Sequence, residues 1–126
     1  MSEHAWRIIA QAMEYLGLEY EPIQYTGTQD DYWVGSFSEG GSVSEDGSTT
    51  TTFFLTGFTR SGWIVLQRAK DLVEKYFTHE GRSFTSDLGG KSTCIISYDT
   101  AYSIPKDDAQ LKSIQINLTI LEWKVR

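Results

Sequence analysis

The chain has 126 residues, which fits one domain whose hydrophobic core needs neither disulfides nor a structural metal. Its formal net charge of −6 argues against nucleic acid as a direct partner, because proteins that bind DNA or RNA need a basic surface. The single cysteine, Cys94, excludes an internal disulfide, and a polar start without a long apolar run predicts neither a signal peptide nor a membrane-spanning helix.

The first predicted element is an amphipathic helix over residues 3–16. Apolar side chains recur along it at the spacing of one helix face. Ser2 can accept a backbone hydrogen bond at its start, and Gly17 can close its end. The expected buried stripe consists of Trp6, Ile9, Ala10, Met13 and Leu16.

Three strands are predicted next, over residues 18–24, 32–39 and 50–60. Pro22 places the first strand at an edge of the sheet, because proline cannot donate a hydrogen bond to a neighbouring strand. The segment between the second and third strands is polar and glycine-rich. We expect it to form a long loop that joins an antiparallel pair. The loop consists of Gly40, Gly41, Ser42, Val43, Ser44, Glu45, Asp46, Gly47 and Ser48.

A second amphipathic helix is predicted over residues 62–77, with Ser61 as its N-terminal cap. A loop-rich section over residues 79–91 follows, in which residues 82–85 can form a short strand, and then a strand over residues 92–98. After them, Pro105 favours a helical turn. The expected buried stripe of the second helix consists of Val65, Ala69, Leu72, Val73 and Tyr76.

Residues 112–126 form the clearest pattern in the chain. Apolar residues alternate with polar ones up to Ile120, which predicts a strand with one buried face. Leu121, Trp123 and Val125 then continue the apolar series one residue out of step. Such a change of phase favours a β-bulge or a strong twist near residues 120–121.

The predicted order of elements is α-βββ-α-ββ. Strands clustered between two helices favour an α+β fold with a single mostly antiparallel β-sheet and two main helices packed on it. Neither an internal repeat nor a linker divides the sequence, so we expect one domain over residues 1–126. Without a targeting segment, the expected location is the cytoplasm.

The sequence contains no catalytic or metal-binding motif that can be named. His4 and His79 have no metal-ligand spacing, and Cys94, in a strand-like run, is expected to be a buried, inert thiol. Asp30–Asp31 and Asp107–Asp108 have the sequence of solvated turns. Gly89–Ser92 lacks the upstream glycine of a phosphate-binding loop and leads into a strand. We therefore predict a protein that is not an enzyme, with no catalytic residue, cofactor or metal.

Five stretches with a distinctive composition follow one another along the chain. They are Tyr32–Glu39, Thr51–Gly57, Ile104–Asp108, Leu111–Leu118 and Glu122–Lys124. With the two predicted helices, they cover most of the sequence. Together they resemble the tail terminator (tail completion) proteins of long-tailed bacteriophages and prophages, in the pattern of the fold rather than in any catalytic signature.

This resemblance implies an α+β subunit that closes into a homo-oligomeric ring, typically a hexamer. The ring would cap the finished tail tube and offer its other face to the head. The implied partners are copies of the chain itself, the tail tube protein and the head connector protein, with no specific nucleic acid and no membrane. The loop Gly40–Ser48 would reach a neighbour or the tube. Assembly in the cytoplasm of a bacterial host and a place in the virion tail are further implications.

Three other interpretations stay open. A head–tail connector or a minor tail protein has a similar size and style. A small ligand-binding domain would gather Trp33, Phe53, Trp63 and Trp123 around an apolar pocket. A small hydrolase or transferase has the least support, because no nucleophile, base and orienting group can be named together.

Overall fold

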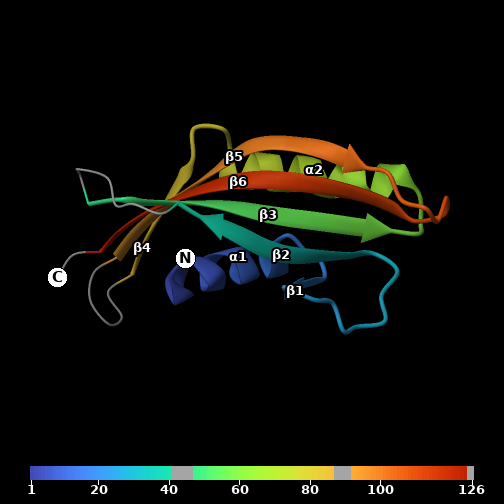
Figure 1. Ribbon diagram of the computed structural model, residues 1–126, viewed down its shortest axis with the longest axis horizontal. Helices are drawn as coiled ribbons and strands as arrows, with labels where there is room; N and C mark the ends of the chain where they lie inside the picture. The colour runs from blue at the N-terminus through green and yellow to red at the C-terminus, as the bar shows by residue number, and fades with distance from the viewer. Residues whose placement is uncertain (41–46, 87–91, 125–126) are drawn as a thin grey trace.

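The computed structural model describes residues 1–40, 47–86 and 92–124, which form two helices and six strands (Figure 1). The order confirms an α+β fold, with the short fourth strand added to the predicted series. The elements are α1 (Glu3–Tyr15), β1 (Tyr20–Pro22), β2 (Tyr32–Glu39), β3 (Thr49–Thr59), α2 (Trp63–Phe77), β4 (Arg82–Ser86), β5 (Ser92–Ile104) and β6 (Lys112–Lys124).

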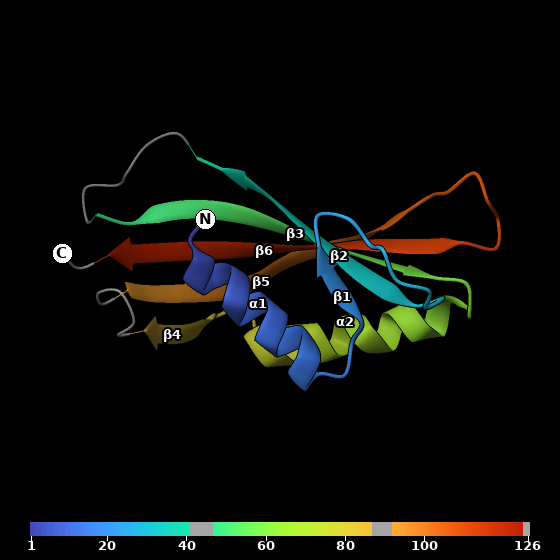
Figure 2. The ribbon, with the colours of Figure 1, turned by 90° about the horizontal axis from the view of Figure 1, so that it is seen from below.

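The six strands form one twisted sheet in the order β1-β2-β3-β6-β5-β4. Every neighbouring pair is antiparallel except β1 and β2, which run parallel. β1 is shorter than predicted and lies at an edge, as Pro22 indicated. Both helices cover the same face of the sheet (Figure 2), so the other face carries no helix. We call that second surface the open face.

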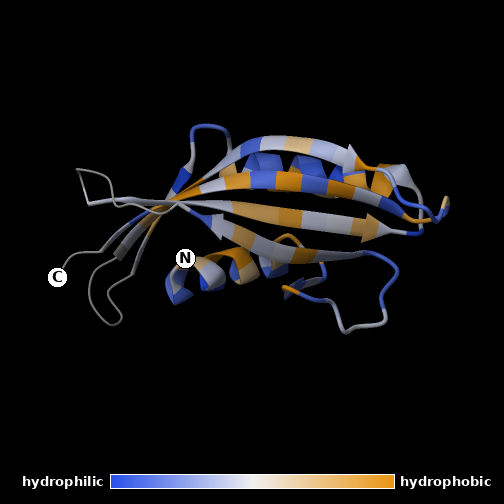
Figure 3. Ribbon diagram, in the orientation of Figure 1, coloured by the Kyte–Doolittle hydropathy of each residue, from blue (hydrophilic) through white to orange (hydrophobic). Residues whose placement is uncertain are grey.

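The core lies between the two helices and the covered face of the sheet. Alternate residues of the central strands point into it, and Phe53 of β3 and Leu118 of β6 lie opposite each other with no exposed surface. Figure 3 shows the matching alternation of hydrophobic and hydrophilic residues along β6. Val73 and Phe77 of α2 and Ile9 of α1 close the core from the helix side.

The two ends of α1 are formed as predicted. The Ser2 hydroxyl accepts a hydrogen bond from the backbone N–H of Ala5 at 3.1 Å. Gly17 follows the last turn with a φ of 73°, a left-handed conformation that glycine adopts without a side-chain clash. Its backbone N–H donates to the carbonyl of Glu14 at 3.0 Å, which satisfies one free end of the helix.

The buried stripe of α1 differs from the predicted one. Ala10 is exposed, and Trp6 is half-buried at the margin, where its ring meets Phe37 and Phe53 edge-on. The small alanines let the helix approach the sheet closely, so they take the inward positions that the bulky Trp6 was expected to fill. The buried residues are Ala5, Ile8, Ile9, Ala12 and Met13.

The cap and stripe predicted for α2 are also wrong in detail. Gly62 occupies the N-cap position without a side-chain cap, while the Ser61 hydroxyl donates to the carboxylate of Asp31 at 3.3 Å. Leu72 is 43% exposed, because the helix is rotated so that Leu66 and Phe77, rather than Leu72 and Tyr76, face the sheet. The buried residues are Leu66, Ala69, Val73 and Phe77.

The predicted irregularity in the last strand is absent from β6. Its register with β3 runs without a break from Lys112 to Glu122. The inward series continues past Ile120 with the buried Glu122, whose carboxylate accepts a hydrogen bond from the Ser2 backbone N–H at 3.1 Å. Leu121 and Trp123 therefore belong to the open face. One buried, hydrogen-bonded carboxylate made the hydrophobic pattern look out of phase.

The irregularity lies instead in β5, between Tyr98 and Thr100, where the register with β6 shifts. This bulge lets β5 continue to Ile104, six residues beyond the predicted end of the strand. Pro105 then opens a connecting segment whose hydrogen-bonded turn lies later than predicted, where the Leu111 backbone N–H donates to the Asp108 carbonyl at 3.1 Å. The loop that connects β5 to β6 projects beyond the end of α2 (Figure 2).

Candidate functional site

The most distinctive surface of the molecule is the open face of the sheet. The strand register places seventeen described residues of β2, β3, β5 and β6 on this face, not counting the aromatic residues at one end that are described below. None of the seventeen is charged, and the exposed Asp99 lies beside them at the register shift in β5. They are Val34, Ser36, Ser38, Thr50, Thr52, Phe54, Thr56, Thr93, Ile95, Ser97, Thr100, Tyr102, Gln115, Asn117, Thr119, Leu121 and Trp123.

Hydrogen bonds between amides and hydroxyls order the middle of the open face. The Gln115 side chain donates to the Asn117 amide oxygen at 3.0 Å, and the Asn117 side chain donates to the Thr100 hydroxyl at 3.1 Å. Phe54 and Tyr102 stand among these polar groups, and Tyr102 is 49% exposed. A neutral surface of hydroxyls, amides and a few rings resembles the centre of a protein–protein contact, from which charged residues are depleted.

An aromatic stack closes one end of the open face. Tyr25 lies 4.1 Å from Tyr32, ring centre to ring centre, and Tyr32 lies 5.1 Å from Phe58. The ammonium group of Lys106 sits 5.1 Å from the centre of the Phe58 ring, a cation–π distance. The stack joins the β1–β2 and β5–β6 connections, which fixes the boundary of the open face at this end.

The predicted interface loop is described only at its two ends. Gly40 is exposed, and its backbone N–H donates to the Thr50 carbonyl at 3.2 Å. Gly47 is exposed with a φ of 83°, whereas Ser48 is buried. The structure therefore places the join of the loop to β3 inside the fold. Gly41, Ser42, Val43, Ser44, Glu45 and Asp46 lie outside the described residues.

The structure does not gather the aromatic residues proposed as a ligand pocket. Trp33 borders a cleft of about 620 Å³ between α1, α2 and β2, whereas Trp63 borders a separate hollow of about 360 Å³ beside Ile104. Phe53 is fully buried in the core, and Trp123 lies on the open face. The four side chains occupy four different places, so the pocket that they were expected to form is absent.

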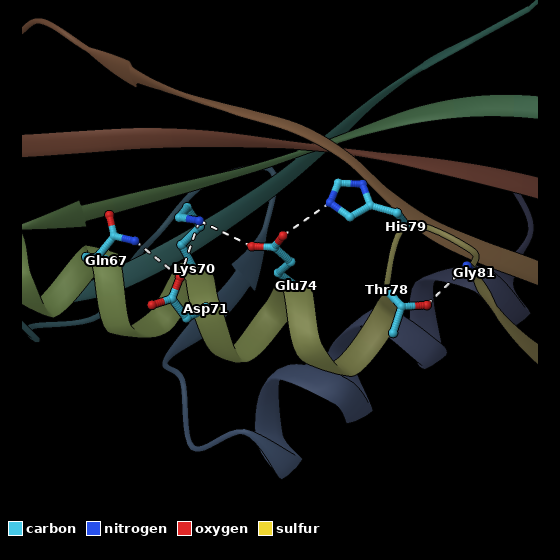
Figure 4. A network of polar contacts seen from close by, with 7 residues as sticks. All are labelled: Gln67, Lys70, Asp71, Glu74, Thr78, His79 and Gly81. Carbon is cyan, nitrogen blue, oxygen red and sulfur yellow. Dashed lines mark hydrogen bonds and ion pairs between the residues drawn. The ribbon is translucent and has the colours of Figure 1, made fainter.

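A network of titratable groups joins α2 to the start of the following turn (Figure 4). The Glu74 carboxylate lies 3.4 Å from the Lys70 ammonium and 3.1 Å from the His79 ring nitrogen. The His79 ring meets Tyr98 of β5 edge-on at 5.1 Å, and burial raises the pKa of the Tyr98 hydroxyl. His79 is 62% exposed, so the contacts tie the helix to the sheet from outside rather than lining a reaction chamber.

Both aspartate pairs lie near the end of β3. Asp31 accepts hydrogen bonds from the hydroxyls of Thr59 and Ser61, which anchors the chain before β2 to the end of β3. Asp108 forms an ion pair with Arg60 at 2.8 Å, and the guanidinium lowers the pKa of this carboxyl. Asp31 and Asp108 thus each have a local partner within the fold.

Cys94 is buried, as predicted, and we expect it to be chemically inert in the folded protein. Burial, with a smaller contribution from the Glu122 carboxylate, raises the pKa of its thiol to about 12. At pH 8 the reactive thiolate should be about a thousandfold scarcer than for an ordinary cysteine. A thiol reagent should therefore label the native protein very slowly and the guanidinium-unfolded protein completely. Labelling of the native protein at the rate of free cysteine would contradict this expectation.

Within residues 1–40, 47–86 and 92–124, no three histidine, cysteine or acidic side chains come together in a way that could hold a metal ion. Neither of the two helices described there is long and apolar enough to cross a bilayer.

Comparisons with known proteins give one informative result. Neither a protein-family profile nor a curated protein matches the sequence. Among solved structures, the fold is similar to a chain in the virion of a native gene transfer agent (GTA) particle. The TM-score is 0.62 at 12% sequence identity, over 90% of this chain and 84% of that chain. At this identity, the similarity establishes a shared fold.

Proposed function

We propose that this protein is a non-enzymatic structural component of phage or prophage tail assembly. In this proposal, its copies form a ring, with six subunits, that caps the tail tube and joins it to the head. The observation that carries the proposal is the shared fold with a chain of a virion, which extends over 90% of the present chain. The protein would assemble in the cytoplasm of a bacterial host and remain in the virion tail.

The open face supports an assembly role. Its ordered amides and hydroxyls, without charge, can pack against another protein without burying an unpaired ion. The deeper cleft beside Trp33 has acidic and basic groups at its rim, Glu19, Asp31 and Arg68, but Asp31 is already held by Thr59 and Ser61. The geometry therefore favours binding to proteins over catalysis.

The loop Gly40–Ser48 is the part of the chain that we assign to a neighbouring subunit or to the tube. Removal of residues 42–46, with the buried Ser48 kept in place, should leave the melting temperature within a few degrees of the wild type, because this serine- and acid-rich sequence has little to bury. It should sharply reduce the joining of tails to heads. The yield of infectious particles measures the effect, and a normal yield would remove the loop from the proposal.

Electron microscopy of particles made without this protein separates the proposed role from its closest competitor. A missing terminator should leave overlong tail tubes without heads. The shared fold supports a head–tail connector equally well, because the similar chain belongs to a virion whose description does not say where in the particle that chain lies. Loss of a connector should leave tubes of normal length beside filled heads. Joined particles of normal shape would contradict both roles and favour a minor tail protein.

A further inference from the structure

The charges of the chain are divided unevenly along its length. No lysine or arginine occurs between Arg7 and Arg60, whereas eight acidic residues lie in that interval. Residues 1–59 hold nine of the 17 acidic and one of the 11 basic residues, a net charge of −8, so residues 60–126 have a net charge of +2. The sheet preserves this division, because β1, β2 and β3 form one half of it and β6, β5 and β4 form the other.

The acidic half ends at the β1 edge, which carries an exposed hydrophobic residue. Ile23 follows β1 directly and is 62% exposed, and Glu19 and Glu21 precede it on the same edge. Its φ of 67° lies in the left-handed region, which a β-branched residue occupies only under strain. Two hydrogen bonds hold this conformation: Ile23 N–H to the Gly35 carbonyl at 2.8 Å and Gln24 N–H to the Pro22 carbonyl at 2.7 Å.

The other half ends at the β4 edge, beside a surface of aromatic rings and an arginine. The guanidinium carbon of Arg82 lies 4.3 Å from the centre of the Tyr76 ring and 5.9 Å from that of Phe84. Tyr15 of α1 stands 5.8 Å from Tyr76 and is 79% exposed. We call Tyr15, Tyr76, Arg82 and Phe84 the aromatic–arginine patch. Exposed Lys75 and Glu80 lie close to it in the chain. Tyrosine and arginine are the side chains most enriched at the energetic centres of protein interfaces.

We propose that the β1 edge of one subunit docks on the aromatic–arginine patch of the next subunit. Ile23 supplies the apolar anchor against the tyrosine rings, and Glu19 faces Arg82 of the partner subunit. The occupant is a second copy of this chain, because the acid-only edge complements Arg82 in the part of the chain, residues 60–126, that holds ten of the 11 basic residues. This inference rests on the proposed ring and names the contact that builds it.

β1 and β4 are the two opposite edges of the sheet, and Tyr15 and Tyr76 extend the patch from β4 onto the helices. A contact between two different surfaces is heterologous, so each subunit keeps one edge free for the next until the ring closes. A contact between two β1 edges would instead place acidic groups against acidic groups. The charge division therefore favours head-to-tail assembly over a two-fold dimer.

Charge reversal tests the contact with the full chain, alone and with tail tubes from cells that lack this protein. Glu19→Lys and Arg82→Glu should each lower the amount of ring by about tenfold or more, measured by electron microscopy and sedimentation, because each puts like charges across the junction. A mixture of the two variants should restore rings. In an alternating ring, the lysine introduced by the first substitution meets the glutamate introduced by the second, and the native Glu19 and Arg82 meet at the next junction.

Cross-linking gives a second, independent measurement. The variant with both Glu19→Cys and Arg82→Cys should form a ladder of disulfide-linked oligomers on mild oxidation, and buried Cys94 should not interfere. The matched control replaces exposed Asp107 and Arg82 by cysteine and should stay uncross-linked.

The edge contact is overturned if Glu19→Cys cross-links with itself, or if mixing the two charge-reversal variants does not restore rings. If the wild type forms rings and both charge-reversal variants form them equally well, the proposed ring is supported and this contact is wrong. If the wild type forms no ring even on tail tubes, the proposed function fails as well.

Discussion

Leu118→Ala should lower the free energy of unfolding by about 2–5 kcal/mol, because it leaves a cavity in the centre of the core. Leu118 has no exposed surface, and it lies between Phe53 of β3 and Tyr98 of β5 in the strand register. Phe53 belongs to an unbroken antiparallel ladder with β6, and Tyr98 is paired with β6 up to the bulge, which limits how far the surroundings can collapse into the vacated space.

Urea unfolding followed by circular dichroism measures this loss, with Thr119→Ala as the matched control. Thr119 is the next residue in β6 and lies on the open face, so its replacement removes a hydroxyl without opening the core. The control should change the unfolding free energy by less than about 1 kcal/mol. Similar midpoints for Leu118→Ala and the wild type would show that the inward face of β6 is wrongly assigned.

Gly35→Ala should destabilise the fold by about 1–3 kcal/mol through overpacking. A side-chain carbon at this position of β2 would lie 2.4 Å from the Phe53 ring and 2.5 Å from the Tyr20 hydroxyl. Neither neighbour can withdraw freely, because Phe53 is fully buried and the Tyr20 hydroxyl is enclosed without a hydrogen-bond partner within the described residues. The same enclosure raises the pKa of Tyr20.

Gly40→Ala is the matched control for this substitution. Gly40 directly follows the same strand, and the nearest atom to an added side-chain carbon is the Thr50 carbonyl oxygen at 3.6 Å, an ordinary contact distance. Its midpoint in thermal unfolding should equal or slightly exceed that of the wild type, because alanine reduces the freedom of the unfolded chain. Equal melting temperatures for Gly35→Ala and Gly40→Ala would contradict the close packing of β1 and β3 against Gly35.

The sequence was sufficient to predict the elements with strong periodicity. The α+β class, both helices, the bounds of β2 and the edge position of β1 follow from amphipathic spacing, turn residues and one proline. These features depend on neighbours along the chain, which a single sequence displays directly.

Features that depend on distant partners were not predictable in the same way. Glu122 is buried because Ser2, 120 residues earlier, donates a hydrogen bond to it, and nothing local to β6 signals that contact. Ser61 meets Asp31 across the end of β3 instead of capping α2. The open face became visible only when the strand order placed four separate runs of uncharged residues side by side. In the sequence, the sign of this face was that the polar residues alternating with apolar ones in these strands are mostly serine, threonine, asparagine and glutamine rather than charged residues.

The position of β6 has a consequence for folding during synthesis. The ribosome makes β6 after the other five strands, yet β6 lies between β3 and β5 and is the bridge that joins the two halves of the sheet. Until it leaves the exit tunnel, β3 and β5 both present long unpaired edges, which are templates for aggregation. The nascent chain thus gains its cooperative core only once β6 has been made, and a chain that stops before residue 112 has two incomplete sheets that nothing joins.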